Sequence, residues 1–168
     1  SFSRIYAHEV QAVFMYNSER WNADATFTAE PERRTLDQKT GIMQADTVRS
    51  SVSLIPRLSV QYMDKDWSFG MTYDGSTSQP DISSLLSLTD NSNPLYITRG
   101  NPRLKAAYRQ SLSFDGRNSP LGLSVNIRLS NTINEQTLAV YYNPQTGGRI
   151  SSPVNINGNR DANLYVSY

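Results

Sequence analysis

The sequence predicts an all-β protein, an up-and-down antiparallel sheet of about eight strands that forms part of a transmembrane β-barrel. Three observations support this fold class. Apolar and polar residues alternate with period two along most of the chain, short turns alternate with long polar connections, and aromatic residues gather beside the short turns. Helical spacing is absent apart from one turn expected around residues 81–88.

The alternation is clearest from residue 21 onward. One face of this strand carries Trp21, Ala23, Ala25, Phe27 and Ala29, and the other carries Asn22, Asp24, Thr26, Thr28 and Glu30. The same pattern predicts strands at 51–62, 67–74, 108–115 and 121–130, with a bulge or sheet edge at Pro56, which has no N–H to donate. We therefore expect one lipid-side face to hold Ala23, Ala25, Phe27, Leu123, Val125 and Ile127, and one lumen-side face to hold Asp24, Thr26, Asn126 and Arg128.

The connections fall into two classes. Short turns are expected near 17–20, 63–66, 116–120 and 157–161, and long polar connections near 35–47, 75–104 and 131–148. In an antiparallel meander, alternating connections lie at opposite ends of the sheet, so all the long ones should share one end. Long polar loops are also expected to be the most mobile parts.

Two segments repeat a common pattern, Phe14–Phe27 and Val60–Tyr73, each with a Tyr, four mostly polar residues and a Trp. This repeat predicts an aromatic girdle beside the short turns, made of Tyr16, Trp21, Tyr62 and Trp67. Aromatic cross-strand pairing next to hairpin turns is the alternative interpretation.

The composition narrows the function classes. A net charge of +1 gives no electrostatic case for nucleic acid, and the absence of Cys excludes disulfides and thiol chemistry. Only 38% of the residues are apolar, which a membrane strand tolerates because it turns every second residue to lipid. Strand-like alternation reaches both ends, so we expect residues 1–168 to be one partial barrel domain from a longer chain.

Catalytic and metal sites are not expected. The single histidine, His8, lies in a strand without a nucleophile motif near it, which favours a lumen or interface position. Asp64 and Asp66 flank Lys65 in a turn, where Asp is common in any case. Residues 90–93 offer oxygens to Ca²⁺ but lack the glycine and distal Glu of an EF-hand. We expect no cofactor and no metal.

The segment 79–105 resembles one family over about thirty residues. A Pro-rich start, then Asn-Pro-Leu, then Gly-Asn-Pro-x-Leu-Lys before a strand is similar to a long extracellular loop in the outer-membrane β-barrel family of TonB-dependent receptors. The matching residues are Pro80, Asp81, Asn93, Pro94, Leu95, Gly100, Asn101, Pro102, Leu104 and Lys105. Ala106-Ala107 departs from the family, which often has Pro-Glu there, and Asn155–Gly158 is similar to a less specific strand-to-turn phrase.

The resemblance implies a transporter, not an enzyme, in the outer membrane of a Gram-negative bacterium. It implies import of a nutrient such as a siderophore, cobalamin or glycan, with membrane lipid around the barrel and with TonB and a plug domain as partners outside this segment. The prolines bias Asn93 and Asn101 away from the helical region, so the motif is expected to shape the loop and not to bind ligand.

Two rival functions remain open. A soluble carbohydrate-binding or adhesive β-domain would pack Trp21, Phe69 and Leu123 into a closed core. An outer-membrane enzyme of small-barrel type would need a convergent polar site, which one His does not supply. If the barrel interpretation holds, the isolated segment has two open edges and an apolar face, and we expect it to self-associate.

Overall fold

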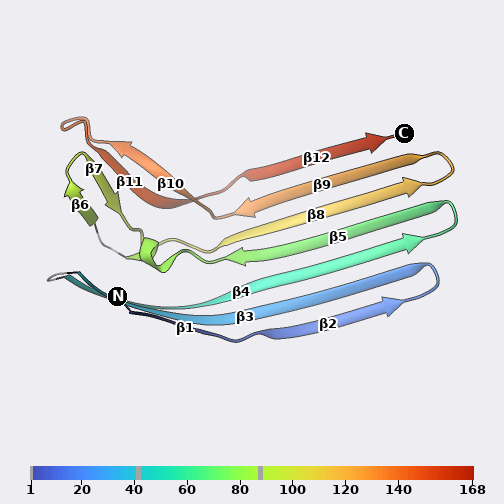
Figure 1. Ribbon diagram of the computed structural model, residues 1–168, viewed down its shortest axis with the longest axis horizontal. Coiled ribbons are helices and arrows are strands. Elements are labelled where there is room, and N and C mark those ends of the chain that lie inside the picture. Colours follow the sequence, from blue (N-terminus) through green and yellow to red (C-terminus); the bar gives the residue numbers. More distant parts are fainter. Residues whose placement is uncertain (1, 41–42, 87–88) are drawn as a thin grey trace.

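The structure is a computed structural model that describes residues 2–40, 43–86 and 89–168. It contains two β-sheets and one short helical element (Figure 1). The main sheet consists of β1 (Phe2–Ala7), β2 (Val10–Asn17), β3 (Trp21–Thr40), β4 (Met43–Met63), β5 (Trp67–Ser78), β8 (Ala107–Asn118), β9 (Leu123–Ile133) and β12 (Asn159–Ser167). The second sheet consists of β6 (Thr89–Asn93), β7 (Tyr96–Arg99), β10 (Glu135–Tyr142) and β11 (Arg149–Ile156), and the helix is the 3₁₀ turn η1 (Ile82–Leu85).

The main sheet is an up-and-down antiparallel meander, as predicted. Its strands follow the order β1, β3, β4, β5, β8, β9, β12, and β2 also pairs with β3. β2 pairs with residues 22–29 of β3, beside the tight turns, and β1 pairs with residues 32–37 of the same strand. Together β1 and β2 therefore occupy one strand position at the edge of the sheet. No pairing joins this edge to β12 within the described ranges, and the sheet is therefore open.

The two ends of the main sheet differ, and three of the four predicted short turns lie together at one end. Tight turns at 18–20, 64–66 and 119–122 lie together at one end, on the right of Figure 1. The third of these falls slightly later than the predicted 116–120, because β8 continues to Asn118. The second sheet and η1 lie at the opposite end (Figure 1).

Two of the three predicted long connections are mostly strand. β3 and β4 stay paired from Trp21–Tyr62 as far as Thr40–Met43, through the polar stretch 35–47 that was expected to be a loop. Residues 41–42 of that stretch lie outside the described residues. In the third connection, 131–148, residues 131–133 belong to β9 and Glu135–Tyr142 form β10. Backbone pairing does not require apolar side chains, so the polar composition of the first connection did not end β3 and β4. In the third connection the expectation of a polar loop was itself wrong, because Leu138–Tyr142 of β10 are apolar or aromatic.

The connection 75–104 is the true long loop. β5 occupies its first residues to Ser78, and η1 supplies the helical turn expected around 81–88. Ser87 and Leu88 of that expected turn are outside the described residues. Asp81 caps η1, since its side chain accepts a hydrogen bond from the Ser83 amide at 3.0 Å.

The turn predicted at 157–161 is wrong. The β9–β12 ladder ends at Thr132–Asn159 and the β10–β11 ladder resumes at Glu135–Ile156, in the same register. These four strands are therefore one long hairpin with a kink. Positive φ angles at Asn134 (54°) and Gly158 (100°) produce the kink, in a conformation that glycine and asparagine tolerate.

Pro56 does not form a bulge with β3, because Phe27–Pro56 lies in an unbroken ladder. It does lie at a ladder end, since the pairing of β4 with β5 begins one residue later at Arg57–Asp74. Beyond it the Thr77 hydroxyl accepts from the Leu54 amide at 3.0 Å and donates to the Leu54 carbonyl at 3.1 Å. A side chain thus takes the backbone bonds that the ladder lacks there.

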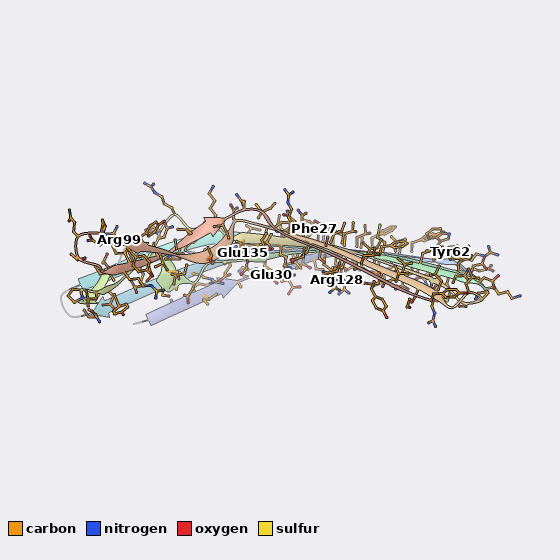
Figure 2. The ribbon with its side chains drawn as sticks, turned by 90° about the horizontal axis from the view of Figure 1, so that it is seen from above. Phe27, Glu30, Tyr62, Arg99, Arg128 and Glu135 are labelled. Atoms are coloured by element: carbon orange, nitrogen blue, oxygen red, sulfur yellow. The ribbon has the colours of Figure 1, made fainter. Side chains whose placement is uncertain are left out.

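Within the described part of the chain, no helix has the length and apolar character needed to cross a membrane. Seen edge-on, the main sheet is a single layer with side chains standing off both faces (Figure 2). The buried apolar side chains of the described residues are Pro80, Leu85, Leu86 and Leu104, all in the long loop or at its end. The main sheet itself has no enclosed core in the described residues.

Candidate functional site

The strand register separates the main sheet into a polar and an apolar face. One row across the sheet runs Asp24–Ser59–Thr72–Ser113–Arg128–Asn163. The adjacent row, on the other face, runs Ala23–Val60–Met71–Phe114–Ile127–Leu164. The predicted face sharing is therefore confirmed: Phe27 lies with Ile127, and Asp24 lies with Arg128. Outer-membrane barrels turn such an apolar face to lipid and the polar one to the lumen.

Large side chains on the apolar face are exposed. Trp21 is 49% exposed, Phe27 50% and Leu164 68%, although each would be expected inside a water-soluble protein. An apolar surface of this extent marks a membrane or partner interface. The packing around Trp21 and Phe69 that a soluble β-domain would need is absent from the described structure.

The apolar face has the height of a membrane. Trp21 and Pro31 mark its limits on β3, ten residues apart. A strand that rises about 3.3 Å per residue and tilts by about 45° covers about 23 Å of depth over that stretch, close to the apolar band of known barrels.

The apolar band also runs obliquely across the strand ladders. On β3 and β4 the row of Phe27 and Pro56 is still apolar. Gly75 of β5 lies against Pro56 in this row. On β8, β9 and β12 the same row is polar, with Gln110, Asn131 and Arg160. A flat membrane boundary cuts obliquely across the rows only where strands tilt, as they must in a barrel.

Aromatic rings line the apolar face beside the tight turns. The ring centroids of Trp21 and Tyr62 are 4.8 Å apart, and those of Trp67 and Phe69 5.4 Å apart. Tyr16 lies one row farther from the turns, opposite Ala23. The Tyr62 hydroxyl reaches the Asp64 carboxylate at 3.3 Å, so its polar tip points towards the turn. The contacts fit a girdle and cross-strand pairing alike, and the girdle assignment stays a prediction.

Two further aromatics, Phe69 and Phe114, lie beside these rings on the apolar face and were not among the predicted girdle residues. Phe69 lies 6.2 Å from both Tyr62 and Phe114, measured between ring centroids. Phe69 follows Trp67 by two residues, so extending the period-two pattern along the strand identifies it. Phe114 is brought beside it by the β5–β8 register, which the sequence alone does not show.

The long loop folds over the polar face at the end opposite the tight turns. The Gln79 amide donates to the Ser53 hydroxyl at 3.3 Å, and the Arg49 guanidinium donates to the Leu104 carbonyl at 3.0 Å. Ser53 and Arg49 both project from the polar face of β4. Leu85, Leu86 and Leu104 are at most 5% exposed, so the loop has a small core of its own. Pro80 of the predicted motif is fully buried.

Gly100 and Asn101 hold the two halves of this loop together. The Asn101 amide donates to the Ser84 carbonyl at 2.7 Å, which joins the loop's end to η1. A Cβ at position 100 would collide with the Leu86 carbonyl oxygen, so only glycine fits there. The Asn101 side chain accepts from the Arg103 amide and donates to the Pro153 carbonyl of β11 at 2.9 Å.

Hydrogen bonds join the two segments that resemble the family, 79–105 and 155–158. The Asn155 side chain accepts from the Lys105 amide at 2.8 Å and donates to the Lys105 carbonyl at 3.0 Å. It also donates to the Asn134 carbonyl at 2.7 Å, at the kink of the long hairpin. Asn157 closes the kink by accepting from the Asn134 amide at 2.7 Å. Sequence reasoning treated the phrase 155–158 as minor and missed this pairing.

The middle of the motif packs on the second sheet. Asn93 accepts a hydrogen bond from the Leu95 amide at 3.0 Å, which forms the turn between β6 and β7. The Leu95 carbonyl then accepts from the Arg149 amide at 2.7 Å, where β7 starts to run parallel to β11. Leu95 itself is exposed, as are Pro94, Pro102 and Lys105.

The acidic candidates Asp64 and Asp90 accept hydrogen bonds within their own turns, and Glu32 of β3 forms an ion pair. The Asp64 carboxylate accepts from the Lys65 amide and pairs with Arg20, and chiefly the amide bond lowers its pKa. Asp90 accepts from the hydroxyl and amide of Ser92, which lower its pKa. Glu32 binds Arg34 and raises the pKa of that guanidinium. No cluster of three or more potential metal ligands occurs in the residues that the structure describes.

The comparisons with known proteins agree with this geometry. The outer membrane protein beta-barrel family matches residues 6–168. No curated protein matches the chain. A solved structure described as a double mutant of the Serratia marcescens hemophore receptor HasR, in complex with its hemophore HasA and heme, is similar to the chain with a TM-score of 0.70 at 16% identity. The similarity covers 95% of this chain but 31% of that one, and it concerns the fold. With its family match over nearly the whole length, the chain belongs to the outer membrane protein beta-barrel family.

Proposed function

We propose that this chain forms part of the barrel wall of a TonB-dependent transporter that imports a nutrient across the outer membrane of a Gram-negative bacterium. The observation that most supports this proposal is the long loop, which folds over the polar face and is fixed there by the motif residues. A loop in this position narrows the extracellular mouth of the barrel, where a transporter selects its cargo. HasR, described with a hemophore and heme, is a receptor of similar fold.

The polar face supplies the lining of the transport path. Asp24, Ser59, Thr72, Ser113 and Arg128 form one row on it, with hydroxyls between an acid and a base. Such a row offers hydrogen bonds to a polar cargo and to water, and Met15 of β2, opposite Asp24, is its apolar end. Energy and closure would come from TonB and a plug domain, and the cargo would be a siderophore, cobalamin or glycan.

The motif residues Gly100, Asn101 and Lys105 are proposed to shape this loop and not to contact cargo. Their backbone and side-chain bonds are directed into the protein, to η1, β11 and the kink. Residues that bind cargo would instead need free polar groups facing the mouth. The chemistry of transport also needs no bond-making residue, so no enzymatic activity is proposed.

An uptake assay tests the proposal. The gene would be deleted in its host, and uptake of labelled siderophores, cobalamin and oligosaccharides would be compared with the parent strain. We expect one cargo class to lose uptake, and the same loss in a strain without TonB or with a protonophore. Uptake that continues without TonB would show a passive channel and contradict the proposal.

We also propose that residues 1–168 are a partial barrel domain. The open edges formed by β1, β2 and β12 and the exposed apolar face then need partners, so the isolated segment would self-associate. Light scattering without detergent checks this. A stable monomer in water would contradict both the partial barrel and the lipid-facing assignment.

A further inference from the structure

The second sheet has two edges of opposite character. β6 forms one edge with only five residues, Thr89–Asn93, all of them polar, and its register with β7 shifts between Asp90 and Asn93. Short length, charge and an irregular register are devices that keep an edge strand from pairing with other chains. The β6 edge is therefore protected against the addition of a further strand.

β10 forms the opposite edge and has none of these devices. It pairs with β11 in an unbroken register, from Glu135–Ile156 to Tyr142–Arg149. The segment Thr137–Tyr142 contains no charge, proline or glycine, and its threonine, valine and tyrosines favour strands. The other side of β10 pairs with no strand in the residues that the structure describes. An open edge of this length and composition is a template for pairing with another chain.

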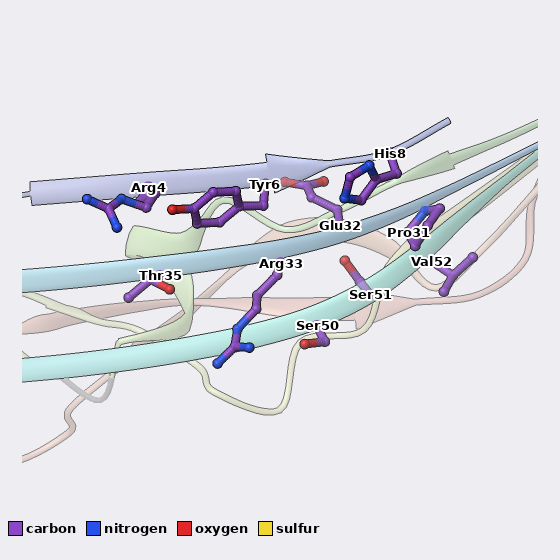
Figure 3. A pocket seen from close by; sticks show the side chains of 10 residues that line it. All are labelled: Arg4, Tyr6, His8, Pro31, Glu32, Arg33, Thr35, Ser50, Ser51 and Val52. Carbon is purple, nitrogen blue, oxygen red and sulfur yellow. The ribbon is translucent and has the colours of Figure 1, made fainter. Parts of the chain in front are cut away.

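The edge of the main sheet at β1 differs in charge from β10. Side chains of β1, β3 and β4 line an open groove of about 910 Å³ beside that edge (Figure 3). Arg4 of β1 and Arg33 of β3 are among them, so charged side chains accompany this edge. The charged residue of β10 is Glu135, at its start, and the Glu135 carboxylate accepts from the Asn159 side chain at 2.7 Å. An uncharged edge is thus a particular feature of β10.

β10 offers apolar side chains on both of its faces. Leu138 and Val140 project from one face and are exposed, and Tyr141 projects from the other and is 57% exposed. Side chains of a strand added beside β10 would alternate in the same way, so they would meet apolar neighbours on either side.

Both ends of β10 are held in place. At the hairpin tip, the Asn143 amide donates to the Gly148 carbonyl and the Gly147 amide donates to the Asn143 carbonyl, each at 2.8 Å. At the start of the strand, the Gln136 side chain donates to the Lys105 carbonyl at 3.3 Å. An edge that is already ordered costs little conformational entropy when a further strand binds.

The direction of β10 limits which strand can pair with it. β10 continues β9 away from the tight turns, and therefore away from the membrane in an outer-membrane barrel (Figure 1). An antiparallel partner must run towards the membrane. A second copy in the same membrane has the same orientation, so its β10 could pair only in parallel, which is the less stable arrangement. A polypeptide that approaches from outside the cell has no such restriction.

We propose that β10 binds an extended, uncharged segment of an extracellular protein by strand addition. Every second residue of an edge strand directs its N–H and C=O groups outward, and an extended backbone is the chemistry that satisfies them. The side chains of the segment would pack against Leu138 and Val140 on one face and Tyr141 on the other. The inference depends on membership of the outer-membrane family and not on the proposed transport.

Peptide binding by the full-length natural protein in detergent tests the proposal. The probe is a short fluorescent peptide of valine, threonine and tyrosine with a lysine at each end for solubility. We expect saturable binding by fluorescence anisotropy and slower hydrogen exchange of amides within 137–142, without a change in β6. Methylating two amide nitrogens on the pairing edge of the peptide should weaken binding about 25-fold, at about fivefold for each lost main-chain hydrogen bond.

Two protein variants separate the two edges. Leu138→Lys/Val140→Lys adds charges at exposed positions of β10 and should weaken binding at least about tenfold, because charged side chains on an edge oppose strand addition. Ser92→Lys adds a charge to β6 and should leave binding unchanged. Intact cells that display the natural protein should bind the peptide on their surface, and cells with the double Lys variant should bind less.

Four results would overturn the proposal. The first is no binding by the natural protein, including the case in which the amides within 137–142 are all protected before peptide is added, because the rest of the chain then covers the edge. The second is equal binding of the methylated peptide, which would show an apolar contact without strand pairing. The third is an equal loss in Ser92→Lys. The fourth is a dimer of the natural protein that the double Lys variant loses, which would assign the edge to a second copy.

Discussion

The main sheet and the long loop bury their apolar side chains in opposite ways. In the main sheet the large apolar residues stand exposed on one face, as Phe27 and Leu164 do. In the loop Leu85, Leu86 and Leu104 are enclosed, with Leu104 only 2% exposed, as in a protein that folds in water. One chain is thus adapted to two solvents, and the boundary between them lies where β3 and β4 leave the apolar band.

The two regions are also held together differently. Ladders between neighbouring strands hold the main sheet, and the same pair of backbone hydrogen bonds recurs at every second row. The loop depends on single side chains that replace such ladders, above all Asn101 and Asn155. A substitution in the main sheet should therefore change stability by placing an unsuitable side chain in lipid or in water. A substitution in the loop should change it by removing individual hydrogen bonds.

The largest effect is expected for a charge on the lipid-side face. Leu58→Arg places a cation near the middle of the apolar band and should lower the free energy of unfolding in a bilayer by about 2–4 kcal/mol. Ser59→Arg is the matched control, because it projects to the polar face opposite Asp24. Urea titration of folding into lipid vesicles measures both variants. Equal losses would refute the assignment of the two faces.

The next effect concerns close packing in the loop. Gly100→Ala forces a Cβ against the Leu86 carbonyl oxygen and should destabilise the loop by about 1–3 kcal/mol. Gly70→Ala, in the main sheet, meets only Asp115 atoms at 3.8 Å or more and should be tolerated. Limited proteolysis checks the pair, with faster cleavage between 79 and 105 in the first variant alone. Unchanged cleavage would show that the loop does not depend on this contact.

A smaller effect is expected where the two phrases of the sequence meet. Asn155→Ala removes three hydrogen bonds and should cost about 1–2 kcal/mol locally, because water can replace part of them. Asn159→Ala, which removes one bond to Glu135, serves as its control. Hydrogen exchange at the Lys105 amide is the measurement. If that amide exchanges at the same rate in both variants, Asn155 does not anchor the loop.

The smallest effect is expected on the pKa values of two exposed acids, Asp64 at the tight-turn end and Asp90 in the second sheet. Both have a lowered pKa, so each stabilises the fold above the unfolded pKa, and that contribution is lost as the pH falls through the folded pKa. Ser92→Ala removes the hydroxyl that contributes most to the Asp90 shift, and should raise that pKa without moving that of Asp64. NMR titration of the two carboxyl carbons measures this. A joint shift would mean that the acids sense something other than their own turns.

Sequence reasoning succeeded where the structure repeats. The alternation from Trp21 to Glu30 identifies the face of every residue, because successive side chains in a strand point to opposite sides. It failed where backbone pairing continued through polar residues, as in β3 beyond Arg34, and it overlooked β10, although Leu138–Tyr142 are apolar or aromatic. The kink at Asn134 and Gly158 was mistaken for a turn because both use the same residue types.

For the candidate site, the motif residues were found from their order along the chain, but their partners were not. Asn155 follows Lys105 by fifty residues, and only the folding of the long hairpin over β8 brings them together. The same holds for Arg4 and Arg33, which reach one groove through the β1–β3 register.

The sequence by itself therefore determined the central strands of the main sheet, their two faces and the end at which the long loop lies, because these depend on local period and composition. The tertiary structure alone decided that the loop covers the polar face, that the hairpin kinks instead of turning, and that the apolar band runs obliquely. Each of these depends on register between strands that are distant in the chain, and register is set by pairing, not by any single strand.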